Sequence, residues 1–189
     1  MLMIIMDKTF KKLSEAGFFL KKMQSEYDKH DDFEYYFSAF ISACRSVLWV
    51  LKAEYGKNKG WLEWYASKVP EEDERKFLQK TNDIRVRSEK HTPLEAGLME
   101  TMALDKSAMP DEIYQYFLDG NTDELDIKFH DSSSIIINGR HIVPIVANKF
   151  YKEVDEFKGE DILDICSKYF NMISGVVNES KSYLEQNNH

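Results

Sequence analysis

The clearest pattern in the chain is an apolar stripe whose members recur every three or four residues, the rhythm of one helix face. Its members are Phe33, Phe37, Phe40, Ile41, Cys44, Val47, Leu48, Leu51 and Tyr55. Trp49 and Val50 widen the apolar surface beyond one stripe, which is typical of a central helix in a bundle or of a dimer interface. We therefore predict a long helix that is capped by Asp31 or Asp32 and ended by Gly56.

Weaker stripes predict a first helix over 10–29 and a closing helix over 160–186. The first has the members Phe10, Leu13, Gly17, Leu20 and Tyr27. The last has the members Ile162, Ile165 or Cys166, Tyr169, Ile173, Val176 and Tyr183. Because glycine costs about 1 kcal/mol against alanine inside a helix, Gly17 indicates close approach of a neighbouring helix.

Two more helices are expected between these. Trp61, Trp64 and Tyr65 crowd a short helix, which we interpret as a lid packed over the bundle. Pro70 suits the first turn of the next helix, and that helix is expected to continue to about Lys90. The segments 94–108 and 110–120 follow; we expect a helix in each, although the first lacks a clean stripe.

The period then changes to two. Leu125, Ile127 and Phe129 alternate with polar residues, the rhythm of a half-buried strand. Asn138-Gly139 between β-branched residues predicts a hairpin. Pro144 is expected to force its strand to an edge or out of the sheet. We predict a small antiparallel β-meander over 124–146.

Together these patterns predict a mainly α fold in one domain over 1–189: a helical core over 10–92, the β-meander insertion and the closing helix. The net charge of −8 argues against a general nucleic-acid binder but leaves room for a local basic site. Cys44 and Cys166 fall in helical stripes and are expected to be buried, free thiols. The first six residues fit neither a signal peptide nor a membrane span, so we expect a cytoplasmic protein without membrane attachment.

The common signatures of nucleotide, zinc and redox chemistry are absent: there is no phosphate-binding glycine loop, HExxH or paired CxxC. We therefore predict no metal and no cofactor. His130, Asp131 and His141 lie on or beside the hairpin and form a two-histidine, one-carboxylate set, but exposed hairpin residues are more often simply solvated.

A sharper candidate lies at the end of the helix before Pro93, where Arg85, Arg87, Glu89 and His91 gather. An arginine that holds a phosphate and a histidine that moves a proton are the two parts that a metal-free ribonuclease needs. A helix C-terminus also favours Arg and His through its dipole, which explains the same residues without any chemistry.

The runs FEYYFSAFISACRSVLWVLKAEYG, WLEWY and FLQKTNDIRVRSEKH resemble the helical core of HEPN-type proteins, specifically a bacterial HEPN-like group. The resemblance covers about residues 10–95 and extends less firmly to FKGEDILDICSKYFNMI. It implies an all-α bundle that commonly dimerises. In catalytic members, an arginine followed after four to six residues by a histidine forms a metal-independent endoribonuclease site across the dimer.

Arg85 and His91, with five residues between them, fit this interval, so the resemblance implies that Arg85 holds the scissile phosphate and His91 acts as general acid-base. Arg87 would add a phosphate contact. The implied partners are a second copy of the chain, RNA and an antitoxin-type protein. The position after the arginine is usually polar in active members and is Val86 here. Many HEPN proteins are instead non-catalytic dimerisation, interaction or regulatory modules, and this second interpretation stays open.

Overall fold

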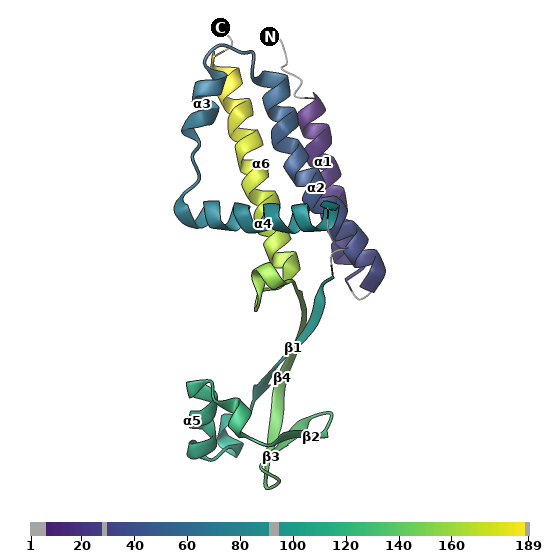
Figure 1. The fold of residues 1–189 in the computed structure, drawn as a ribbon, viewed down its shortest axis with the longest axis vertical. Helices are drawn as coiled ribbons and strands as arrows, with labels where there is room; N and C mark the ends of the chain where they lie inside the picture. Colours follow the sequence, from purple (N-terminus) through teal and green to yellow (C-terminus); the bar gives the residue numbers. More distant parts are fainter. Residues whose placement is uncertain (1–6, 28–29, 91–94, 188–189) are drawn as a thin grey trace. The chain divides into compact units, whose positions relative to one another are not determined.

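The computed structural model describes residues 7–27, 30–90 and 95–187. The chain divides into two compact units (Figure 1). Residues up to 97 and from 152 onward form the first, which we call the helical unit, and residues 98–151 form the second, the inserted unit. The inserted part is thus larger than the 124–146 meander that the sequence predicts.

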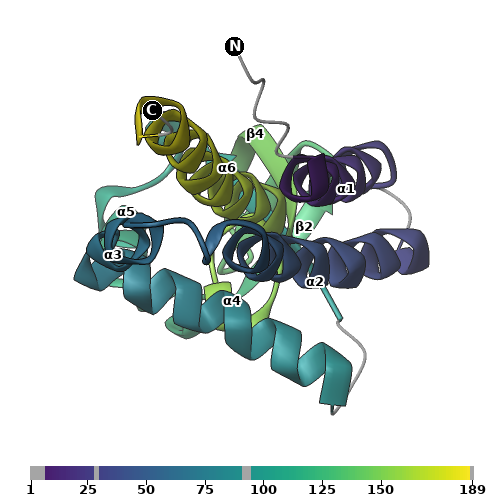
Figure 2. The ribbon, with the colours of Figure 1, turned by 90° about the horizontal axis from the view of Figure 1, so that it is seen from above.

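The described part of the helical unit contains five helices. They are α1 (Asp7–Ser25), α2 (His30–Tyr55), α3 (Trp61–Ser67), α4 (Glu72–Lys90) and α6 (Ile162–Asn187), with the short 3₁₀ helix η3 (Asp155–Phe157) before α6. Figures 1 and 2 show α1, α2 and α6 side by side, with α4 crossing them. None of the helices in the described residues combines the length and apolarity that a membrane span requires.

The predicted stripe of α2 is confirmed as the centre of this unit. Every member is buried except Leu48, which is partly buried against the same core. The predicted cap is wrong, because the helix begins at His30 and so contains Asp31 and Asp32 in its first turn. Gly56 follows the last helical residue as predicted, and its N–H donates to the Lys52 carbonyl (2.8 Å).

The short aromatic helix α3 is a cover over the bundle, as predicted. Trp61 is fully buried, and its indole Nε1 donates to Ser180 Oγ on α6 at 2.8 Å. Its ring stacks on Tyr65, with centroids 5.0 Å apart, and Trp64 stacks on Tyr183. A buried indole whose N–H has a partner stabilises the fold, so these aromatics serve packing.

Gly17 marks a close approach of α1 and α6, as predicted. A Cβ built at this position would lie 3.2 Å from the ring of Phe170. On α6 the buried face differs slightly from the expected stripe: Val177 and Leu184 are buried, whereas the predicted Val176 and Tyr183 are partly buried beside them.

A hydrogen-bonded tyrosine ties the two halves of the helical unit together across the insertion. Tyr27 donates to Asp161 (3.0 Å) and accepts from the Lys152 N–H (2.7 Å). Asp161 also accepts from Leu163 N (3.0 Å), so it caps the start of α6. Burial, together with the negative charge of Asp161, raises the pKa of Tyr27 to about 12, which keeps the hydroxyl a donor.

The inserted unit is a four-stranded sheet in the order β1-β4-β3-β2, with one longer helix. Its elements are β1 (Gly97–Leu104), η1 (Lys106–Ala108), α5 (Asp111–Asp119), η2 (Thr122–Glu124), β2 (Ile127–Asp131), β3 (Ser134–Ile137) and β4 (His141–Glu153). Its small core lies between the sheet and α5 and consists of Met109, Ile113, Ile135, Ile137 and Val143. The predicted helix over 110–120 is confirmed, since α5 ends at a left-handed Gly120.

The hairpin prediction is also confirmed. Asn138 and Gly139 have φ of 50° and 67°, as a type I′ turn requires, and Arg140 N donates to Ile137 O (3.1 Å). The expected half-burial of β2 is wrong: it is an edge strand whose residues are all exposed, Phe129 to 62%.

Two other expectations are wrong. Residues 97–104 form strand β1 and not a helix, because they pair with β4. Pro144 does not end its strand, since β4 continues to Glu153 beside β1, although its pairing with β3 ends at Pro144. The Pro144 carbonyl accepts from Asp105 N (2.9 Å). The N and O of one strand residue point to the same side, so the N of Pro144 also faces the side of β1. Because β1 ends at Leu104, the N–H that proline lacks costs the sheet little stability.

Two glycine substitutions should change stability in opposite directions. A Cβ at Gly56 would lie 2.5 Å from the Lys52 carbonyl oxygen, so Gly56→Ala should lower the free energy of unfolding by about 1–3 kcal/mol. A Cβ at Gly175, inside α6, would have no heavy atom within 4 Å, so Gly175→Ala should raise it by about 0.5–1 kcal/mol. Urea unfolding followed by circular dichroism measures both, and a shift of the same sign in the two variants contradicts the prediction.

Candidate functional site

The candidate site lies on the second half of α4. Phe77, Thr81 and Ile84 are the buried residues of this helix, at spacings of four and three, and they pin one face onto the bundle. Pro70 lies two residues before the helix, whose first residue is Glu72, and not within its first turn as predicted. The burial of Ile84 fixes the rotation of the helix end, and it therefore fixes where the neighbouring arginines point.

Arg85 is held in a small polar network between α4 and α2. Its Nη1 donates to Glu89 Oε2 (2.6 Å) and its Nη2 to Asn82 Oδ1 (3.3 Å). Glu89 in turn accepts from Ser42 Oγ on α2 (3.1 Å). The Arg85 side chain is 24% exposed, and its Nε is buried with no hydrogen-bond partner among the described residues. The Nε of Arg87 is buried and without a partner among the described residues in the same way, so this feature does not distinguish the two arginines.

A second arginine, Arg45 on α2, acts on the same region. Burial raises the pKa of the Tyr169 hydroxyl to about 12, and the positive charges of Arg45 and Arg85 oppose this rise. Both guanidiniums are therefore close enough to Tyr169 to lower its pKa, one from α2 and one from α4. The sequence interpretation did not select Arg45; the available signal was its place on α2 off the apolar stripe.

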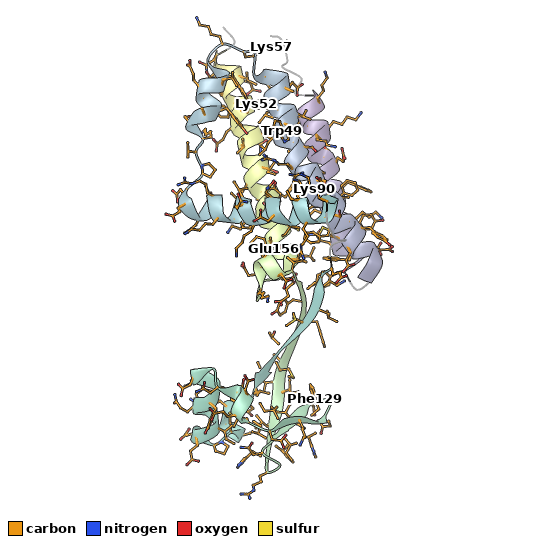
Figure 3. All side chains as sticks on the ribbon, in the orientation of Figure 1. Trp49, Lys52, Lys57, Lys90, Phe129 and Glu156 are labelled. Atoms are coloured by element: carbon orange, nitrogen blue, oxygen red, sulfur yellow. The ribbon has the colours of Figure 1, made fainter. Side chains whose placement is uncertain are left out.

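Arg87, which is predicted to add a phosphate contact, is already engaged by a carboxylate. Its Nη2 donates to Glu156 Oε2 in η3 (2.8 Å), and both side chains are mostly buried. It also lines a hollow of about 340 Å³ together with Glu95, Glu153 and Asp155. Figure 3 labels Glu156 beside this end of the bundle. A setting with this many carboxylates repels phosphate, and no described contact joins Arg87 to Arg85.

His91, the predicted general acid-base, lies outside the described residues. The described part of α4 ends at Lys90, labelled in Figure 3. The five-residue interval between Arg85 and His91 remains a property of the sequence. The structure places the arginine of this pair and leaves its histidine a prediction.

The other candidate groups do not form a site. Asp131 Oδ1 accepts from Ser133 N, Ser133 Oγ and Ser134 Oγ, and these bonds lower the pKa of Asp131 to about 2. In the parts of the chain that the structure describes, no three His, Cys, Asp or Glu residues gather as a metal site would require. Cys44 and Cys166 are buried, free thiols, as predicted, and burial raises the pKa of both.

A second hollow, of about 370 Å³, lies between α6, α2 and the segment that leads into α4. Leu48, Val69, Leu78 and Val176 are among its lining residues. Its walls are mainly apolar, and the charged pair among its lining residues, Lys68 and Glu179, is joined in an ion pair. The polar network around Arg85 remains the stronger candidate.

No family model, curated protein sequence or solved structure matches this chain. The HEPN-like interpretation therefore depends on the residues quoted from the sequence and on the geometry around α4.

If Arg87 is a structural tether, it should be coupled energetically to Glu156. Arg87→Met and Glu156→Gln should each lower the free energy of unfolding, and the double variant should lose less than the sum, with a coupling of about 1 kcal/mol for this partly screened pair. Urea unfolding of the wild type, the two single variants and the double variant gives the four free energies of this double-mutant cycle. A coupling near zero would remove the tether interpretation and return Arg87 to the list of ligand-binding candidates.

Proposed function

We propose that this chain is a HEPN-like protein that cleaves RNA without a metal ion, with Arg85 as its phosphate-binding group. The observation that supports this most is the position of Arg85: a partly exposed side chain beside α2, held by Glu89 and Asn82 of its own helix, with a histidine six positions further along the sequence. Arginine presents a fork of donors that matches a phosphate, which lysine lacks.

The chemistry needs one proton acceptor, one proton donor and compensation of charge. A histidine in its neutral form takes the proton from the ribose 2′-hydroxyl, and the 2′-oxygen attacks the adjacent phosphorus. The bond to the 5′-oxygen breaks, and that oxygen receives a proton from an imidazolium. Arg85 compensates the charge that grows on the phosphate oxygens. The products are a 2′,3′-cyclic phosphate and a 5′-hydroxyl.

A homodimer suits this scheme because it supplies two copies of His91, one for each proton transfer. Each protomer would contribute Arg85 from α4, together with its His91, to a shared cleft. An antitoxin-type protein that covers this helix end would switch the activity off. These partners are parts of the proposal and follow from the family resemblance.

Glu89 is the group that RNA must displace. Its carboxylate occupies the same Arg85 donors that a phosphate would take, at 2.6 Å. The pair is partly exposed, and such pairs contribute only about 0–1 kcal/mol. A phosphate with additional contacts can therefore replace the carboxylate, so the ion pair is compatible with binding.

A non-catalytic module is the competing function, and two observations favour it. Arg85 and Arg87 both already have carboxylate partners, and Val86 stands where active HEPN members usually carry a polar residue. Such a module predicts a dimer that hydrolyses no RNA, with or without metal, and that still binds its protein partner after His91→Ala.

Substitution of either member of the pair should abolish cleavage. Arg85→Ala and His91→Ala are expected to leave a structured RNA intact in the presence of EDTA, while the wild type cleaves it and the melting temperature hardly changes. Gel analysis with end-group mapping and a thermal melt measure both. Arg75→Ala, an exposed arginine in the first half of α4, is the matched control and should cleave normally. A wild type that cleaves no RNA, or two variants that cleave normally, rules the nuclease out.

Removal of the competing carboxylate should strengthen RNA binding. Glu89→Gln keeps the shape and the hydrogen bond but deletes the charge, so the affinity for RNA should rise about two- to five-fold, which corresponds to a surface ion pair. Fluorescence anisotropy at fixed ionic strength gives the dissociation constant. Glu72→Gln, which removes an exposed charge at the other end of α4, should have a much smaller effect. Equal effects of both changes would mean that net charge alone is responsible.

A further inference from the structure

An exposed tryptophan lies on the face of α2 opposite the buried stripe. Trp49 is 62% exposed, and Arg45 and Lys52 are exposed four residues before and three residues after it, on the same helix face. The Arg45 guanidinium lies 5.6 Å from the centroid of the Trp49 ring. Figure 3 labels Trp49 and Lys52 along this helix. We call these three residues the α2 platform.

The positive charge of the platform is unmatched. Arg45 and Lys52 form no hydrogen bond or ion pair with any residue in the described ranges, in contrast to Arg85 and Arg87. Residues 42–62 contain four basic side chains and a single carboxylate before α3, Glu54, in a chain of net charge −8. Glu54 is already engaged, since it accepts from Thr9 N and Thr9 Oγ1.

The positive charges of Arg45 and Lys52 also determine which kind of partner could bind over the Trp49 indole. Two copies of the chain that met around a twofold axis at Trp49 would bring two Arg45 and two Lys52 side chains into one interface. That arrangement costs free energy through like-charge repulsion. A polyanion with flat apolar rings fits instead, because its phosphates complement the cations and its bases stack on the indole.

We propose that the α2 platform binds single-stranded RNA, with one base stacked on Trp49 and the flanking phosphates on Arg45 and Lys52. This rests on the proposed function, whose substrate strand it would guide. Ser42, which donates to Glu89 beside Arg85, lies one turn before Arg45 on the same helix. From Ser42 to Trp49 the helix rises about 10 Å. A strand of a few nucleotides spans that distance and leads from the platform to Arg85.

The test uses the full chain and a fluorescein-labelled oligouridine whose 2′-O-methyl groups prevent 2′-oxygen attack. Trp49→Ala should weaken binding about ten-fold or more by anisotropy, and Trp49→Phe should recover part of the loss. Arg45→Gln with Lys52→Gln should reduce the slope of log affinity against log salt by about 1.4, the value for two single-strand phosphate contacts. Tyr35→Ala is the matched control, because Tyr35 is 70% exposed on the same helix. This variant should bind the oligouridine with the affinity of the wild type.

The outcomes separate this inference from the nuclease proposal. Binding that depends on Trp49 in a protein that cleaves no RNA supports the platform and removes the nuclease. If the protein cleaves RNA and Trp49→Ala changes neither cleavage nor binding, the nuclease is supported and the platform is removed. The platform is also overturned if the wild type does not bind the oligonucleotide, if Tyr35→Ala weakens binding equally, or if Trp49→Ala turns a dimer into a monomer with RNA affinity unchanged.

Discussion

The burial of one face of α2 is the constraint on which the helical unit depends. Eight side chains of its stripe leave water almost completely, and each Phe, Ile, Leu and Val among them contributes roughly 1.5–3 kcal/mol relative to an exposed side chain. The helices α1, α6 and α4 cover that face, and α3 closes its end with Trp61. The position of the candidate site follows from this packing: because Ile84 is buried against the bundle, the Arg85–Glu89 pair lies where Ser42 of α2 donates to Glu89.

Much of the fold could be predicted where the pattern is long or the turn chemistry strict. The stripe of α2 extends over six turns, and Asn138-Gly139 accommodates the positive φ that few other pairs tolerate. Strand β1 could not be predicted, because its conformation depends on pairing with β4, some forty residues further along the chain. The effect of Pro144 also depends on a distant partner. Its missing N–H would weaken the sheet only if a neighbouring strand had an acceptor for it, and the neighbour on that side, β1, ends at Leu104.

The candidate site shows the same division between local and distant information. The interval between Arg85 and His91 is local and visible in the sequence, as is the intrahelical pair of Arg85 with Glu89. The engagement of Arg87 by Glu156 depends on η3, which lies far along the chain, so the sequence pattern around Arg87 could not show it. Arg45 was missed because an arginine off the apolar stripe looks like ordinary solvated surface until its neighbours, and their lack of carboxylates, are known.

The discontinuity of the helical unit has a consequence for its biosynthesis. Tyr169 of α6 packs edge-on against Phe40 of α2, and Asp161 anchors Tyr27, but the inserted unit separates these partners along the chain. At translation rates of roughly 5–20 residues per second, about fifty inserted residues delay the arrival of α6 by several seconds. For that interval the nascent α2 keeps part of its apolar face open to water. Chaperones that recognise exposed apolar helices would have their longest access to this chain then, before its last helix leaves the ribosome.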